Sequence, residues 1–298
     1  MIKAVIDIGT NSSRLYVSRV EDGEQKKIIK MLSTTRLGEG ILNSRSMLSE
    51  AMERTSNKVR EFCLEAKKHG AEEIFIYATA VVREAENREE FKKQIFDKTG
   101  ITLDVISGQI EGKIAFYGAI DGKSDCAVID IGGGSTEVVT EQGGIFKALS
   151  QKTGGVRLKE KFSNDSGTCN VQEVKDFVKE SYLPLYREKT DISDVKTLIG
   201  VSGTPTTLYS LFTGEKTYKP EIINGGVFSR RDMDMMLEKM AAMTTEERRD
   251  FSGEFKDRAD IIVFGGCILS SFMEYYGFDE ITVSDRDSLE GYLQLKLD

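Results

Sequence analysis

Residues 127–139 read AVIDIGGGSTEVV, and this stretch decides the fold of the chain. It begins with small and β-branched apolar residues interrupted only by Asp130, a pattern typical of a buried strand with a carboxylate near its end. The glycines at 132–134 predict a tight turn whose backbone N–H groups no Cβ shields, so that the turn can close around phosphate oxygens. Ser135 and Thr136 would add hydroxyl donors and lead into the returning strand.

A shorter version of this stretch opens the chain. Residues 4–9, AVIDIG, repeat residues 127–132 letter for letter. The repeat predicts two similar α/β halves, each beginning with a strand, an aspartate, a polar turn and a second strand. Taken singly, either turn could be an ordinary glycine-rich hairpin with a structural aspartate, but the repeat favours two facing hairpins that form a clamp. Such a clamp places Asp7 and Asp130 at one cleft, where paired carboxylates suit a hydrated Mg²⁺ that in turn holds phosphate.

The composition is that of a globular protein with two domains. The chain has 298 residues, of which 39% are hydrophobic and 30% charged, so it can form two cores of ordinary size. No apolar run approaches the roughly 20 residues of a membrane span, and the N-terminus enters a strand without a signal-peptide pattern. We therefore expect a cytoplasmic protein with no membrane partner. The net charge of −8 argues against general nucleic-acid binding.

The sequence disfavours cysteine and histidine chemistry. The four cysteines are widely scattered and include no CxxC pair, so they predict buried thiols rather than a zinc site or a disulfide framework: Cys63, Cys126, Cys169 and Cys267. The only histidine, His69, follows two lysines where a helix is expected to end, a position at which a cation suits the helix dipole. Any acid–base catalysis therefore falls to carboxylates.

Apolar periodicity predicts the remaining elements of both halves. In the first half it predicts strands at 3–8, 13–19, 25–32, 73–78 and 102–106 and helices at 49–68, 87–98 and 107–117. In the second half it predicts strands at 144–152, 198–201 and 280–284, a glycine loop at 153–157, and helices at 171–188, 231–243 and 257–276. Pro184 should kink or end the first of these helices. A closing helix at 287–297 is expected to pack back on the first half, which gives domains of residues 1–118 plus 285–298 and of residues 119–284.

Three further places carry residues suited to phosphate chemistry. Arg83 follows a predicted strand at its carboxyl end, where ligands of α/β proteins usually lie, although a surface ion pair with Glu84 or Glu86 would also explain it. Glu111 lies in the first turns of a predicted helix, where the helix dipole alone would favour an anion. Residues 202–206, SGTPT, precede another helix and predict either an anion site or an ordinary capped turn.

These motifs, in this order, resemble the exopolyphosphatase and guanosine pentaphosphate phosphatase family. The resemblance rests on seven segments spread over nearly the whole chain: VIDIGTNSSRL (5–15), TAVVREAEN (79–87), ISGQIEG (106–112), VIDIGGGSTEVV (128–139), GGVRL (154–158), GVSGT (200–204) and RADIIVFGG (258–266). It implies an α/β fold of two ribonuclease-H-like domains that flank a cleft, as in the sugar kinase, Hsp70 and actin superfamily. It also implies Mg²⁺-dependent hydrolysis of terminal phosphoanhydride bonds in polyphosphate or guanosine pentaphosphate.

The resemblance also implies roles for individual residues. Glu111 resembles the family's catalytic base, and Glu137 resembles a second acid that orients water or metal. Asp7 and Asp130, together with Glu137, would hold Mg²⁺. The expected phosphate ligands are side chains and turn amides: Asn11, Ser12, Arg14, Arg83, Gly133, Gly134, Ser135, Thr136, Gly203 and Thr204.

The chain departs from the family pattern in two places. Ile110 stands where many members have a glutamate, and residues 287–291, DSLEG, only partly match the usual closing GLREG. Longer relatives add a C-terminal helical region of the HD-phosphohydrolase type, which this chain stops before, so we expect a preference for short polyphosphates. The choice between polyphosphate and guanosine pentaphosphate stays open, as does the oligomeric state, with a homodimer the assembly that the resemblance suggests.

Two other functions stay open at this point. A phosphotransferase would share the clamp and the carboxylate base, and ATP-dependent phosphorylation of an acceptor would reveal it. A non-catalytic nucleotide or polyphosphate sensor would bind its ligand without turnover. The presence of both Glu111 and Glu137 disfavours the sensor.

Overall fold

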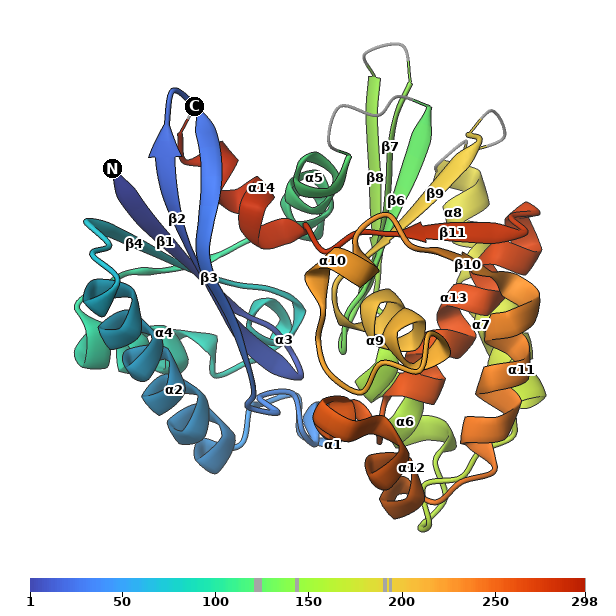
Figure 1. The fold of residues 1–298 in the computed structure, drawn as a ribbon. Coiled ribbons are helices and arrows are strands. Elements are labelled where there is room, and N and C mark those ends of the chain that lie inside the picture. The colour runs from blue at the N-terminus through green and yellow to red at the C-terminus, as the bar shows by residue number, and fades with distance from the viewer. Residues whose placement is uncertain (121–124, 143–144, 190–191, 193–194, 298) are drawn as a thin grey trace.

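The molecule consists of two α/β halves that lie side by side, each built on one mixed sheet (Figure 1). The computed structural model describes residues 1–120, 125–142, 145–189, 192 and 195–297. The predicted fold class, two α/β halves of the ribonuclease-H-like type around a cleft, is confirmed. The boundary expected between residues 118 and 119 adjoins residues 121–124, which lie outside the described residues.

The sheet of the first half has the strand order β3-β2-β1-β4-β5. Its first three strands form an antiparallel meander. Strands β4 and β5 extend the sheet beyond β1 and run parallel to it. The bounds are β1 (Ile2–Ile8), β2 (Ser12–Glu21), β3 (Glu24–Thr34), β4 (Glu73–Ala78) and β5 (Leu103–Val105). The sequence predicts all five strands, and β4 begins and ends at the predicted residues.

The sheet of the second half repeats this plan with the order β10-β11-β9-β6-β7-β8. Strands β6, β7 and β8 form the meander, β9 and β11 run parallel to β6, and β10 adds an antiparallel edge. The bounds are β6 (Cys126–Ile131), β7 (Thr136–Gln142), β8 (Ile145–Gln151), β9 (Thr197–Val201), β10 (Val227–Ser229) and β11 (Glu280–Val283). The internal repeat of the sequence thus corresponds to a repeat of the fold.

Helices cover both sheets and form one large apolar core in each half. The helices of the first half are α1 (Ile41–Ser44), α2 (Ser49–Lys68), α3 (Ala80–Glu84), α4 (Arg88–Thr99) and α5 (Gly108–Ala119). Those that follow are α6 (Gly155–Phe162), α7 (Val171–Ser181), α8 (Leu183–Lys189), α9 (Gly203–Phe212), α10 (Pro220–Ile223), α11 (Arg230–Ala241), α12 (Thr245–Ser252), the 3₁₀ helix η1 (Gly253–Arg258), α13 (Ile262–Tyr276) and α14 (Ser288–Leu295). The apolar faces of α2 and α4 cover the first sheet, and those of α7, α9 and α13 cover the second.

Two helices, α5 and α14, lie between the sheets (Figure 1). Helix α5 packs on the second sheet through Phe116, while α14 packs on the first sheet, where Tyr292 stacks on Tyr77 with ring centroids 4.3 Å apart. The helices cross at backbone contact, because a Cβ at Gly291 would lie 1.8 Å from the carbonyl oxygen of Ile114. The predicted return of the closing helix to the first half is therefore confirmed.

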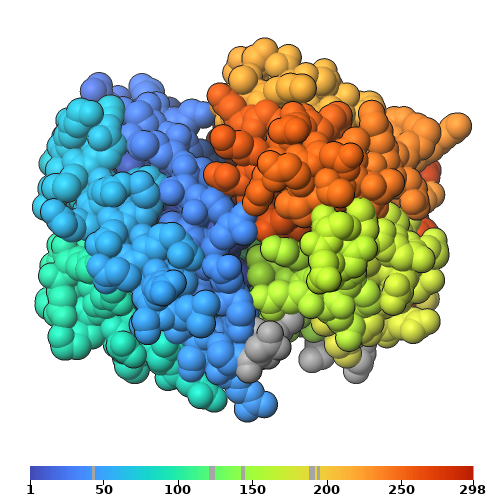
Figure 2. All heavy atoms as spheres, turned by 90° about the horizontal axis from the view of Figure 1, so that it is seen from below, coloured from blue at the N-terminus to red at the C-terminus, as the bar shows by residue number. Residues whose placement is uncertain are grey.

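Ion pairs join the halves along their boundary. Arg36 Nη1 lies 3.0 Å from Asp260 Oδ2, and Arg157 Nη2 lies 2.8 Å from Glu84 Oε2. Seen from below, the lobe coloured blue to cyan lies directly against the green and orange lobe (Figure 2). The two halves are therefore closed against each other in this structure.

The glycine loop predicted over residues 153–157 is wrong, because helix α6 already begins at Gly155. The N–H groups of Gly155 and Val156 donate to the carbonyls of Gly132 and Gly133, both at 3.0 Å. The glycine hairpin therefore satisfies donors that open the first turn of α6, and a turn that looks flexible in the sequence becomes a helix N-terminus.

Further helix bounds differ from the prediction for physical reasons. The helix predicted over 257–276 starts only at Ile262, since the buried Arg248 Nε draws the carbonyl of Ala259 into a hydrogen bond of 2.6 Å. Helix α12 is not predicted because its sequence, TEERRDFS, has little apolar periodicity; a capping box of Thr244 and Glu247 starts it. The break expected near Pro184 is present between α7 and α8.

The predicted burial of the cysteines is confirmed for three of the four and wrong for Cys169, and the predicted place of His69 is confirmed. Cys63, Cys126 and Cys267 are buried, Cys169 is partly exposed, and none of the four forms a disulfide. His69 caps the carboxyl end of α2, with its Nε2 atom 3.1 Å from Glu65 Oε1. Among the described helices, none has both the length and the apolar character needed to cross a bilayer.

Candidate active site

The two repeated hairpins face each other across the boundary between the halves. Their turns close in the same way: the N–H of Gly9 donates to the carbonyl of Ser12, and the N–H of Gly132 to that of Ser135, both at 3.0 Å. The tips touch, because a Cβ at Gly134 would lie 2.6 Å from Thr10 Oγ1. The arrangement is a closed clamp of two glycine-bearing turns.

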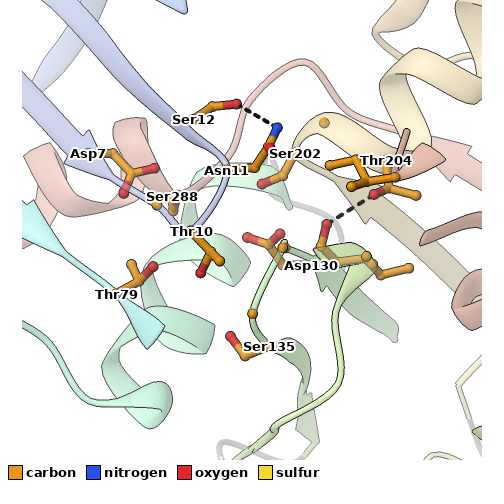
Figure 3. Close-up of a pocket in the computed structure, with 18 of the residues that line it drawn as sticks. Asp7, Thr10, Asn11, Ser12, Thr79, Asp130, Ser135, Ser202, Thr204 and Ser288 are labelled. Carbon is orange, nitrogen blue, oxygen red and sulfur yellow. Dashed lines mark hydrogen bonds between the residues drawn. The ribbon is translucent and has the colours of Figure 1, made fainter. Parts of the chain in front are cut away.

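A cavity of about 80 Å³ lies between the turns, which is room for one phosphoryl group or a few water molecules. Figure 3 shows Asp7 and Thr79 on the side of the first half, with Asp130, Ser202 and Thr204 across from them. The predicted site residues that line this cleft are Asp7, Asn11, Ser12, Arg14, Glu111, Asp130, Gly133, Gly134, Ser135, Gly203 and Thr204. Lining residues with polar side chains to which the sequence analysis assigns no role include Thr10, Thr79, Arg258 and Ser288.

Glu111 enters the cleft from the first turn of α5, a helix that Ser107 caps by accepting a hydrogen bond from the N–H of Ile110. Its Oε2 atom accepts a hydrogen bond of 2.9 Å from Arg83 Nη1. Burial raises the pKa of Glu111 to about 7, against the opposing effect of Arg83. A carboxylate whose pKa lies near neutral pH is suited to take a proton from water.

Asp130 and Glu137 lie opposite each other on neighbouring strands, β6 and β7. Burial raises the pKa of Asp130 to about 7, and burial together with the charges of Glu111 and Asp130 raises the pKa of Glu137 well above its usual range. Glu137 accepts a hydrogen bond of 2.6 Å from Ser150 Oγ and lies behind the cleft wall rather than in it. The carboxyl groups of Glu111, Asp130 and Glu137 thus lie in one buried region, where the charge of each disfavours ionisation of the others.

Arg14 occupies the position in β2 that Glu137 occupies in the repeat, opposite Asp7. Its Nη2 atom lies 2.5 Å from Asp7 Oδ2, and its Nη1 atom lies 2.7 Å from Asp287 Oδ2. Burial alone would raise the pKa of Asp287, but Arg14 and Lys30 outweigh it and hold that pKa below its usual range. The guanidinium of Arg14 is therefore already shared between two carboxylates.

Arg258 presents a guanidinium that no described residue engages by hydrogen bond or ion pair. It lies against Gly203, where an added Cβ would overlap Arg258 Nη1 at 1.9 Å. Burial, followed by repulsion from Arg14, lowers the pKa of Arg258 to about 10, which still leaves it charged at neutral pH. An uncommitted cation at the edge of the cleft is suited to an anionic ligand.

Two predicted phosphate ligands lie outside the central cleft. The hydroxyl of Thr136 donates to the carbonyl of Thr153 at 2.7 Å, so it supports the turn. Arg83 donates to Glu111 and to the carbonyl of Ile106, and lines an outer pocket that shares only Ser135 with the cleft. The alternative surface pairing of Arg83 with Glu84 or Glu86 is not present among the described ion pairs.

The cleft residues that had no predicted role differ in how far the sequence could have revealed them. Arg258 stands in the segment RADIIVFGG, which was singled out without a role for its arginine. Thr10 occupies the repeat position of Gly133 and could have been found from that alignment. Thr79 stands in the segment TAVVREAEN and Ser288 in DSLEG, again without a role for the hydroxyl group; the fold brings Thr79 to the cleft from the end of β4 and Ser288 from the start of α14.

The cleft suits a divalent cation held together with phosphate. Asp7 Oδ1 is buried and has no hydrogen-bond partner, and Glu111 and Asp130 are buried beside it. A phosphate anion would be repelled by these carboxylates unless a cation came with it. In the described part of the chain no three acidic, histidine or cysteine side chains lie close enough to form a complete metal site. One or two carboxylates, completed by water and phosphate oxygens, are what Mg²⁺ usually takes.

Comparison with known proteins places these features in a family. A model described as the Ppx/GppA phosphatase family matches residues 16–298. A bifunctional 3-dehydroquinate synthase/phosphatase of Fusobacterium nucleatum is 35% identical over 97% of this chain and 46% of its own length. Exopolyphosphatase 2 of Mycobacterium tuberculosis is 29% identical over 97% of this chain and 96% of its own length. A guanosine-5'-triphosphate,3'-diphosphate pyrophosphatase of Photobacterium profundum is 28% identical over 97% of this chain and 58% of its own length. The chain thus spans about half the length of the first and third of these relatives.

Solved structures agree with these matches. An exopolyphosphatase from Cytophaga hutchinsonii superposes with a TM-score of 0.89 at 25% identity, over 100% of this chain and 98% of the other. A Ppx/GppA family member from Aquifex aeolicus superposes with a TM-score of 0.81 at 28% identity, over 100% of this chain and 97% of the other. The likeness therefore extends over both halves and the cleft between them.

Proposed function

Because this chain belongs to the Ppx/GppA phosphatase family, we propose that it hydrolyses the terminal phosphoanhydride bond of polyphosphate or of guanosine pentaphosphate. The observation that carries the proposal is the position of Glu111. Its carboxylate, with a pKa raised to about 7, lines a small cleft closed by two glycine turns. No nucleophilic side chain is needed, since phosphoryl transfer depends mainly on positioning and charge neutralisation.

In this proposal the turns bind the terminal phosphoryl group. The N–H groups of Gly133 and Gly134 and the hydroxyl groups of Ser12 and Ser135 line the cavity and can donate to phosphate oxygens. Arg258 would supply the free positive charge at the cavity edge. The turns come from different halves, so we propose that residues 1–118 plus 285–298 and residues 119–284 act as two domains that separate to admit the substrate.

Glu111 would act on a water molecule beside the terminal phosphorus. As the water oxygen forms its bond to phosphorus, the carboxylate takes the water proton, and the anhydride P–O bond breaks with its electron pair passing to the leaving phosphate oxygen. Arg83 would hold the carboxylate in position through its hydrogen bond of 2.9 Å. Glu137, behind the wall, would orient the metal or the water shell.

Asp7 and Asp130, one from each half, would hold Mg²⁺. Their burial and the unpartnered Oδ1 atom of Asp7 support this assignment. When bound, the ion would neutralise phosphate charge.

The test is phosphate release from tripolyphosphate, long polyphosphate, guanosine pentaphosphate and ATP, each with and without Mg²⁺. Glu111→Gln should lower kcat by roughly 10² to 10⁴, the contribution of a positioned base. Glu90→Gln on the exposed surface of α4 is the matched control and should keep full turnover. Equal turnover in the Glu111→Gln protein would refute the role of Glu111, and binding without any release would favour a sensor.

A further inference from the structure

We infer that a second pocket beside the cleft holds the leaving group of the substrate, and that this pocket is built for a nucleoside rather than for a continuing phosphate chain. The inference rests on the proposed hydrolase function. It deepens that function by choosing a substrate class, nucleoside 5′-polyphosphates.

The second pocket has a cavity volume of about 280 Å³ and opens directly from the cleft. The residues that line both are Arg14, Ser202, Gly203 and Arg258. Glu111 is absent from its described lining and instead contacts Arg83, which lines the outer pocket. Among the described residues, the second pocket and the outer pocket share no lining residue.

This arrangement fixes the direction of the substrate. In phosphoryl transfer the attacking and the leaving oxygen lie roughly in line through phosphorus. A water beside Glu111 therefore places the leaving group away from Glu111, and Ser202 and Arg258 line the passage from the cleft into the second pocket. The second pocket is the space into which that leaving group must extend.

The walls of the second pocket are largely apolar. Met31 and Leu32 from β3 are 41% and 50% exposed, and Tyr218 is 42% exposed, which is unusual for apolar or aromatic side chains gathered at one place. Phe255 completes the wall, with its ring centroid 6.5 Å from that of Tyr218. Apolar and aromatic surfaces of this kind bind the faces of nucleobases.

The charges of the pocket do not suit a polyphosphate chain. Its described lining carries three cationic and three acidic side chains: Arg14, Lys30 and Arg258, and Glu254, Asp257 and Asp287. Two of the cations are already in ion pairs with Asp287, at 2.7 Å for Arg14 and 3.2 Å for Lys30. Only Arg258 stays uncommitted, and it lies at the junction with the cleft. One cation at the junction suits the phosphates that link a nucleoside to the cleft, whereas further phosphates would meet carboxylates and apolar walls.

Polar groups in the pocket fit the donors and acceptors of a nucleoside. Thr34 Oγ1 is buried and has no hydrogen-bond partner. Glu254 and Asp257 are exposed carboxylates that can accept hydrogen bonds from ribose hydroxyls or from base N–H groups. A few polar groups in an otherwise apolar pocket are the usual pattern of a small-molecule site.

The experiment compares GTP with tripolyphosphate, which have the same number of phosphates but differ in the nucleoside. The measured quantity is the ratio of kcat/KM for GTP to kcat/KM for tripolyphosphate. We expect the wild-type protein to prefer GTP. Leu32→Ser and Tyr218→Leu should each lower the ratio, the latter by about tenfold, the order of one base–aromatic stack. Leu64→Ser, at an equally exposed leucine on α2, is the matched control and should leave the ratio unchanged.

Binding measured by calorimetry in the Glu111→Gln protein makes the test independent of turnover. There too GTP should bind more tightly than tripolyphosphate, and Tyr218→Leu should remove most of the difference. A wild-type preference for tripolyphosphate, or ratios that the pocket variants leave unchanged, would overturn the nucleoside pocket while leaving the hydrolase intact. No phosphate release from any of the substrates by the wild-type protein would instead overturn the proposed function, and the calorimetric comparison would still decide the pocket.

Discussion

Replacing Arg83 by glutamine should shift the pH at which the enzyme becomes active. Arg83 Nη1 lies 2.9 Å from Glu111 Oε2 and is the largest influence that opposes the effect of burial on this carboxyl group. With burial opposed by Arg83, the pKa of Glu111 is about 7. Without the guanidinium, burial is opposed only by the smaller effect of the Thr79 hydrogen bond, so the pKa must rise.

The size of the shift follows from the geometry. Two opposite charges about 4 Å apart attract by about 4 kcal/mol at an effective dielectric constant near 20. The Arg83 side chain is 24% exposed, so solvent screens part of this energy. Since one pKa unit corresponds to about 1.4 kcal/mol, we expect a rise of about one to two units.

The assay is kcat/KM for phosphate release measured from pH 5 to pH 9. In the proposed mechanism Glu111 works as a base only when it has lost its proton, so activity should fall below about pH 7 in the wild-type protein. In Arg83→Gln this acid limb should move to higher pH, while Arg83→Lys, which keeps the charge, should stay near wild type. Because each variant meets the same substrate, the ionisation of the phosphate cannot produce the difference. A limb that stays in place, with activity lowered equally at every pH, would show that Arg83 acts on the substrate and not on Glu111.

Two further predictions concern the hairpins. Burial raises the pKa of Asp130 from an ordinary value of 3.8 to about 7, so the folded protein holds this proton more tightly than the unfolded chain and loses stability as pH rises through that window. Metal-free Asp130→Asn should therefore melt at a higher temperature than wild type at pH 8, with a gain that shrinks toward pH 5; a gain independent of pH would contradict the assignment. Gly134→Ala should lower kcat by preventing closure, because its Cβ would lie 2.6 Å from Thr10 Oγ1 and 3.2 Å from Ala80 Cβ. Steady-state kinetics should show a smaller loss of kcat when Gly134→Ala is made in the Thr10→Ala protein than in the wild-type protein. Equal losses of kcat in the two proteins would rule out a steric cause.

The parts of the site that could be predicted are those made by neighbouring residues. In AVIDIGGGSTEVV the strand, the carboxylate and the glycine turn all lie within one hairpin, so local patterning predicts their relation. Asp130 and Glu137 fall opposite each other because the turn sets the register of β6 and β7. Glu111 could be placed on a helix start but not in the cleft, since only the packing of α5 against the second sheet brings it there.

The parts that could not be predicted depend on contacts between residues far apart in the chain. Arg14 was expected to bind phosphate, and its hairpin position is as predicted, but its guanidinium is shared with Asp287 from α14. Arg258 was placed in a helix, whereas η1 ends there and leaves its guanidinium beside Gly203. Neither contact can be predicted from local sequence, because the two residues that meet lie far apart in the chain.

The sequence by itself determined that this protein has two repeated halves, a pair of acidic glycine hairpins and a single histidine. These features depend on periodicity, turn residues and composition, which act over a few residues at a time. The tertiary structure alone decided which of the described cations at the second pocket are committed to ion pairs and that Arg258 is not, and it alone formed the apolar pocket beside the cleft. Charges and pockets of this kind arise only when β3, η1 and α14 converge on one place, so their chemistry belongs to the fold rather than to any segment of the chain.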